Sequence, residues 1–141
     1  MGVSKLNAER YPDPTAYEAL TNIARAERAE KHPYRPLVYI CSPFSADPEG
    51  GAEKARKYSR FAVDAGAIPF APHLLLPQYM DESTERDLAM FMDKVFLDRC
   101  EQLWVFGSTV SKGMDAEIRR ARRKSMTIRY FTEELEETNG I

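Results

Sequence analysis

The sequence has few of the residues that build metal sites and disulfide frameworks: only two cysteines and two histidines occur among 141 residues. Cys41 and Cys100 stand alone, without a CxxC spacing, and both lie in apolar surroundings. This pattern is typical of free, packed thiols in a reducing compartment. Because potential ligands are so few and so scattered, we expect no structural zinc site and predict that the protein uses no metal and no cofactor.

Long apolar runs and a large excess of one charge are also absent. No run approaches the roughly 20 residues that a membrane-spanning helix needs, and the first ten residues lack the apolar region of a signal peptide. The formal net charge of −2 gives no support for nucleic-acid binding through bulk charge. The phosphate-binding patterns GxGxxG and GxxxxGK[ST] do not occur either. We therefore expect a cytoplasmic protein that binds neither nucleic acid nor membrane.

What the sequence does contain is an alternation of strand-like and helix-like segments. Short runs of β-branched and aromatic residues predict strands at 37–41, 68–71, 102–106 and 127–131. Apolar periodicity and capping residues predict helices at 13–31, 52–64, 84–99, 113–124 and 133–137, with loops at 42–51 and 72–80. This order implies right-handed crossovers and a three-layer α/β fold, with a flavodoxin- or Rossmann-like parallel sheet of four or five strands. We expect residues 1–35 to form an arm and an extra helix, and residues 36–141 to form one globular unit.

The predicted helix 84–99 is apolar on nearly all sides. Between residues 88 and 97 only Asp93 and Lys94 are charged. A helix of this kind is buried on several sides, so we expect it to form the contact in a homo-oligomer, either a dimer or a larger assembly. Asp93 either pairs with Lys94 or Arg99 at the rim or has a functional role.

The predicted helix 113–124 carries a second conspicuous carboxylate. Its apolar stripe consists of Met114, Ile118 and Ala121, and Glu117 lies on the same side. A carboxylate turned toward the sheet has to be paired, hydrogen-bonded or used, because burying it free is costly. The alternative is that Glu117 lies at the edge of the stripe and pairs with Arg120.

In a parallel sheet the carboxyl ends of the strands meet at one edge, where ligands bind. Asp93 and Glu117 come from helices that flank this edge, and two carboxylates near one crevice suit cleavage at the anomeric carbon of a sugar. Hydroxyl and backbone N–H groups that could hold a phosphate or a sugar come from Ser42, Gly50, Gly51, Ser111 and Gly113. Ser111 could instead be a helix cap, and Gly50–Gly51 an ordinary turn. His73, Gln78 and Tyr79, in the 72–80 loop, could recognise a base, although His73 could also be purely structural.

Three motifs carry a resemblance to a known family. Tyr39-Ile-Cys-Ser-Pro-Phe44 resembles the first-strand motif of the nucleoside 2-deoxyribosyltransferase superfamily. The segment from Asp93 to Phe106 is similar to its helix-to-strand segment, and Ser111-x-Gly113-x-x-x-Glu117 resembles its Gly-x-x-x-Glu motif. The similarity covers residues 37 to 131 or so.

This resemblance implies cleavage or transfer of the N-glycosidic bond of 2′-deoxynucleosides or their 5′-monophosphates. Glu117 would be the nucleophile, Asp93 the acid, and Tyr39 the residue that positions the nucleophile. Ser111 stands where the N-hydrolases of this superfamily carry a phosphate-contacting serine and the transferases an aspartate. The motifs also assign substrate contacts to Pro43, Phe44 and Met114.

Two further interpretations remain open from the sequence. The same pocket could bind a nucleotide without catalysis, as a sensor or a sequestering protein, or the chain could be a structural oligomer with a vestigial cleft. The enzymatic interpretation requires the carboxylates of Asp93 and Glu117 to reach one substrate, at a separation of about 5–9 Å by analogy with glycosidases.

Overall fold

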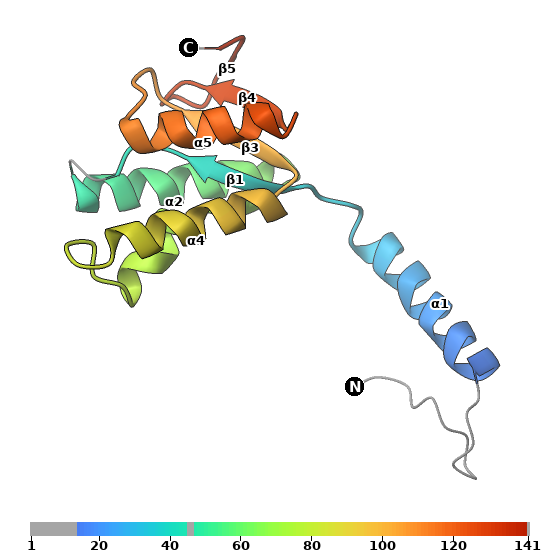
Figure 1. Cartoon of the computed structure of the whole chain (residues 1–141). Helices are drawn as coiled ribbons and strands as arrows, with labels where there is room; N and C mark the ends of the chain where they lie inside the picture. The colour runs from blue at the N-terminus through green and yellow to red at the C-terminus, as the bar shows by residue number, and fades with distance from the viewer. Residues whose placement is uncertain (1–13, 45–46, 141) are drawn as a thin grey trace. The chain divides into compact units, whose positions relative to one another are not determined.

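The computed structural model describes residues 14–44 and 47–140, and the chain divides into two units at residue 34 (Figure 1). The first unit holds helix α1, Pro14–Lys31, as expected for residues 13–31; the expected cap at Asp13 lies outside the described residues. Leu20 and Ile23 lie on α1 with about half of their surface exposed. In the part of the chain that is described, none of the helices combines the length and the apolar character that crossing a membrane requires.

The second unit is built on a single sheet of five strands. These are β1 Leu37–Cys41, β2 Ile68–Phe70, β3 Gln102–Phe106, β4 Thr127–Phe131 and β5 Glu137–Thr138. Their order in the sheet is β2-β1-β3-β4-β5, with the first four strands parallel and β5 antiparallel to β4. The predicted α/β fold class is therefore confirmed, with one short antiparallel strand added at the edge.

Helices cover both faces of this sheet and make the fold three-layered. Helix α2, Pro48–Asp64, packs on one face, and helices α4, Arg86–Arg99, and α5, Lys112–Arg123, lie on the other. Side chains of β1 alternate between the two: Val38 and Ile40 belong to the core under α2, whereas Tyr39 and Cys41 belong to the core under α4 and α5. The side chains of Tyr39 and Cys41 thus point toward α4 and α5.

Two segments that the sequence predicts to be loops contain helical residues. Helix α2 begins at Pro48 rather than at residue 52, because proline suits the first helical position and Asp47 accepts a hydrogen bond from the N–H of Gly50. The 72–80 segment forms a short helix α3, Pro72–Leu75, and a 3₁₀ turn η1, Leu76–Gln78, each with proline near its start. Pro48, Pro72 and Pro77 therefore lie in the first turns of helical segments, not in loops.

The expected boundaries were also wrong in two other places. Helix α4 begins at Arg86, not at Ser83 or Thr84, because Ser83 donates its N–H and its hydroxyl to Asp81 in a local turn. The predicted acidic helix 133–137 does not form. The N–H of Thr132 donates to the carbonyl of Glu136, and Leu135 has a positive φ of 73°. The segment turns back as a hairpin, since so short a helix gains too little to nucleate.

Candidate active site

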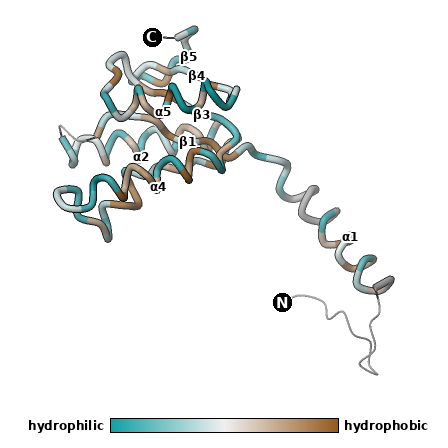
Figure 2. The backbone as a smooth tube through the Cα atoms, in the orientation of Figure 1, coloured by the Kyte–Doolittle hydropathy of each residue, from teal (hydrophilic) through white to brown (hydrophobic). Residues whose placement is uncertain are grey.

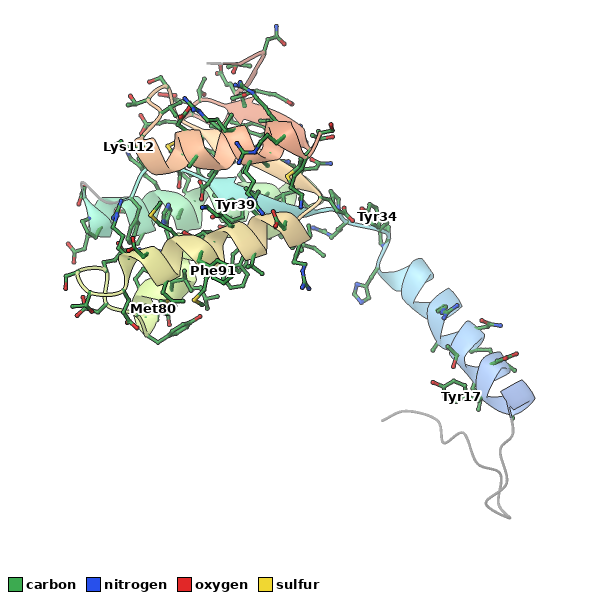
Figure 3. All side chains as sticks on the ribbon, in the orientation of Figure 1. Tyr17, Tyr34, Tyr39, Met80, Phe91 and Lys112 are labelled. Carbon is green, nitrogen blue, oxygen red and sulfur yellow. The ribbon has the colours of Figure 1, made fainter. Side chains whose placement is uncertain are left out.

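The strand order creates a crevice at the carboxyl ends of β1 and β3. These neighbouring strands lead to helices on opposite faces of the sheet, α2 after β1 and α5 after β3. Such a switch point is where open α/β sheets bind ligands. Residues 42–44 leave β1 there, and Ser111 begins α5 there. Figure 3 labels Tyr39 between the ribbons of α4 and α5.

Glu117 is turned inward from α5 and held by Tyr39 of β1. The hydroxyl of Tyr39 donates to Oε2 of Glu117 at 2.5 Å, and the thiol of Cys41 interacts with the same carboxylate and lowers its pKa. Tyr39 and Cys41 are two residues apart, so both point to one face of the strand. Arg120, the partner that a surface-exposed Glu117 would have, instead donates two hydrogen bonds to Asp98. The alternative of a rim ion pair with Arg120 is therefore wrong.

Asp93 approaches Glu117 from the neighbouring helix α4. Its Oδ1 is buried and has no hydrogen-bond partner among the described residues. Within that part of the chain Asp93 also forms no ion pair with Lys94 or Arg99, so the rim-pair alternative is wrong here as well. A buried carboxylate oxygen without a partner is costly, which makes Asp93 available to a ligand.

Two adjoining cavities meet at these carboxylates. The larger encloses about 690 Å³, its open mouth included, and is lined by Ser42, Phe44, His73, Glu82, Arg86, Ala89, Met90, Asp93, Ser111, Lys112, Gly113, Met114 and Glu117. The smaller encloses about 370 Å³, and Lys94, Leu97, Ala116 and Arg120 complete its wall. The residues common to both are Met90, Asp93, Gly113 and Glu117. A molecule entering from either side therefore meets both acids.

Burial changes the protonation of both acids. Burial raises the pKa of Glu117 to about 7, and the interactions with Tyr39 and Cys41 oppose this rise. Burial, together with the negative charges of Glu117 and Glu82, raises the pKa of Asp93 to about 7. Because Glu117 accepts the hydrogen bond of Tyr39 and Oδ1 of Asp93 accepts none among the described residues, the first proton to leave the pair comes from Glu117. Near neutral pH the pair thus holds one anionic and one protonated carboxyl group.

The wall of the larger cavity includes two aromatic rings that are tied to the end of β1. The rings of Phe44 and His73 stack with their centroids 4.5 Å apart and their planes 4° from parallel. Nε2 of His73 lies 2.9 Å from the carbonyl oxygen of Ser42. Burial lowers the pKa of His73, so the neutral ring donates from Nε2 to that carbonyl. The hydroxyl of Ser42 is buried without a partner among the described residues, and it lies in the cavity wall.

Of the residues predicted to contact a substrate, the cavity wall contains Ser42, Phe44, His73, Ser111, Gly113 and Met114. Ser111 also caps α5, since its hydroxyl accepts the N–H of Met114 at 3.3 Å. Pro43, Gly50, Gly51 and Gln78 do not line either cavity.

The residues left outside the wall have other roles. The side-chain amide of Gln78 donates to the carbonyl of Leu74, so it closes a helical turn. Gly50 and Gly51 lie in the first turn of α2. A Cβ on Gly51 would come within 2.8 Å of the Phe44 ring and 2.9 Å of its Cα. Gly51 therefore shapes the site indirectly, by letting the 43–44 segment pack on α2.

Sequence reasoning missed five residues that line the larger cavity: Glu82, Arg86, Ala89, Met90 and Lys112. A local signal for three of them existed. Arg86, Ala89 and Met90 precede Asp93 by seven, four and three residues and so share its helix face. The apolar character of α4 on all sides concealed this face. Arg86 and Lys112 add positive charge to a site whose acids are negative, although Glu82 lies 3.5 Å from Arg86.

In the described ranges, no three or more His, Cys, Asp or Glu side chains come together as metal ligands. Comparison with known proteins adds one match: residues 36–131 fit the model of a family described as a domain of unknown function (DUF7768). No curated protein matches the chain. The matched range contains every residue of the cavity walls.

Proposed function

We propose for this chain, which belongs to the DUF7768 family, cleavage or transfer of the N-glycosidic bond of 2′-deoxynucleosides or their 5′-monophosphates. The observation that carries the proposal is the pair of carboxylates at one cavity, with Glu117 held by the hydroxyl of Tyr39 and with Oδ1 of Asp93 left without a hydrogen-bond partner among the described residues. The deoxynucleoside substrate comes from the resemblance of the three motifs. A pair of unequal carboxylic acids is the arrangement that glycosidic cleavage requires.

In the proposed first step, the carboxylate of Glu117 attacks C1′ of the sugar. The C1′–N bond breaks, its electron pair goes to the base nitrogen, and the protonated Asp93 gives its proton to the departing base. The product is a glycosyl ester on Glu117. In the second step Asp93, now a carboxylate, takes a proton from water, whose oxygen attacks C1′ and restores the carboxylate of Glu117. In a transferase a second base takes the place of water.

The other wall residues suit the two ends of such a substrate. The Phe44–His73 stack offers a flat aromatic surface for a base. The start of α5, with the hydroxyl of Ser111 and backbone N–H groups near Gly113, favours an anion such as a 5′-phosphate, since a helix N-terminus carries partial positive charge. Arg86 and Lys112 supply two full positive charges at the same cavity.

The test is to incubate the full chain with a panel of deoxynucleosides and their 5′-monophosphates and to measure the release of free base. We expect turnover on at least one compound, with a bell-shaped dependence on pH centred near 7, because activity needs one of the two acids ionised and the other protonated. Glu117→Ala should abolish base release while the fold remains intact. Asp115→Asn is the matched control, since Asp115 lies on the same helix and pairs with Arg119 at the surface.

Two outcomes would contradict the catalytic proposal. Unchanged turnover in Glu117→Ala would remove Glu117 from the mechanism. Saturable binding of a nucleotide by the wild-type protein, without base release at any pH, would favour the non-catalytic sensor or sequestering protein instead.

A further inference from the structure

Helix α4 presents a large apolar surface on its outer side. Leu88, Phe91 and Val95 are 50%, 61% and 38% exposed, and they follow the spacing i, i+3, i+7 of one helix face. Only Ala89 and Leu97 of this helix are fully buried. Figure 2 shows the hydrophobic colour along much of α4. A contiguous exposed patch of this kind marks an interaction site.

Two opposite charges flank the centre of this surface. Asp87, Phe91 and Lys94 follow the spacing i, i+4, i+7, so Asp87 lies one turn before Phe91 and Lys94 nearly one turn after it. Among the residues that the structure describes, neither Asp87 nor Lys94 forms an ion pair. Together with Leu88 and Val95 these residues make up what we call the α4 face.

The α4 face is complementary to itself. When a second α4 packs on the first in the antiparallel direction about a two-fold axis near Phe91, Asp87 of each copy lies opposite Lys94 of the other. The same operation brings the apolar side chains of the two copies together, as a symmetric dimer contact requires. We propose that the α4 face is the contact between two copies of this chain, with Phe91 at its centre and two Asp87–Lys94 pairs at its rim.

The contact would lie next to the candidate active site. Lys94 lines the smaller cavity, and Met90, one residue from Phe91, lines both. A second copy on the α4 face therefore borders the side of the cavities that α4 forms. This inference does not rest on the proposed function, because association is measured without any substrate.

The test is sedimentation equilibrium of the full chain. We expect a dimer for the wild type, and for Phe91→Glu a dissociation constant raised at least about 30-fold, as for a central aromatic anchor. Leu20→Glu is the matched control, since Leu20 is an exposed apolar residue of α1, and it should leave the dimer unchanged. Far-ultraviolet circular dichroism and the fluorescence of Trp104, the single tryptophan, confirm that each variant is folded.

A charge reversal tests the geometry separately. Asp87→Lys alone should weaken the dimer, because it places two lysines opposite each other, and the double variant Asp87→Lys/Lys94→Asp should restore it to within a few-fold. A wild type that stays monomeric, a dimer unaffected by Phe91→Glu, or a charge swap without rescue would overturn the proposal. Dissociation by Leu20→Glu in place of Phe91→Glu would assign the contact to α1.

Discussion

Replacing Glu117 by glutamine should stabilise the protein by about 3 kcal/mol at pH 8 and by about 1 kcal/mol or less at pH 5. In the folded protein burial raises the pKa of Glu117 to about 7, against an ordinary value of 4.5. An acid with a raised folded-state pKa contributes stability that is fully present below its unfolded pKa and is lost as the pH rises through its folded pKa. The stability contribution of the Glu117 proton is therefore lost between about pH 4.5 and about pH 7.

The size of the effect follows from these two pKa values. Their difference of about 2.5, at about 1.4 kcal/mol per pKa unit, corresponds to about 3 kcal/mol lost by the wild type at pH 8. At pH 5 most of the folded protein still holds this proton, and the loss is about 1 kcal/mol or less. Glutamine cannot ionise, and its amide oxygen still accepts the hydrogen bond from Tyr39. Glu117→Gln should thus raise the free energy of unfolding by about 3 kcal/mol at pH 8.

The assay is urea unfolding at both pH values, followed by the fluorescence of Trp104, which is 1% exposed in the folded protein. Asp115→Asn on the same helix is the control. It removes only an exposed ion pair with Arg119, so its free energy of unfolding should change by less than about 0.5 kcal/mol at either pH. A Glu117→Gln variant that gains the same stability at pH 5 and pH 8, or that loses stability at pH 8, would refute the reasoning.

Three further predictions concern groups around Glu117. Cys41→Ala removes a thiol whose interaction lowers the pKa of Glu117, so the acid limb of the pH–activity profile should move to higher pH, while Cys100→Ala should not move it. Gly51→Ala should lower the free energy of unfolding by about 1–3 kcal/mol through overpacking, since the added Cβ would meet the Phe44 backbone. Gly113→Ala is the control, because a Cβ there has no atom within 4 Å, and it should leave the free energy of unfolding unchanged. Urea unfolding measures both variants. Ser111→Ala should weaken binding of 5′-monophosphates more than binding of nucleosides in titrations, and an equal loss on both would make Ser111 a helix cap only.

Several parts of the candidate site were predictable because they depend on local periodicity. The stripe formed by Met114, Ile118 and Ala121 is buried as expected, and it turns Glu117 toward the sheet. The strand at 37–41 gave the position of Tyr39, and the cap at Ser111 is confirmed. The position of Gln78 outside both cavities was not predictable. A residue's distance from the sheet edge depends on how the 72–78 segment folds, and the prolines in that segment suit loops and first helical turns equally well.

By itself the sequence determined the succession of the four parallel strands along the chain, the α/β class and the inward side of α5, because each of these follows from patterns that repeat within a few residues. Only the tertiary structure decided which groups meet. Tyr39 donates a hydrogen bond to Glu117, which lies 78 positions later in the chain. Asp98 of α4 accepts a hydrogen bond from Arg120 of α5, 22 positions later. The segment after β4 turns back and pairs with β4 as an antiparallel strand. Such pairings depend on the order and register of the strands, which bring together residues that no local pattern connects.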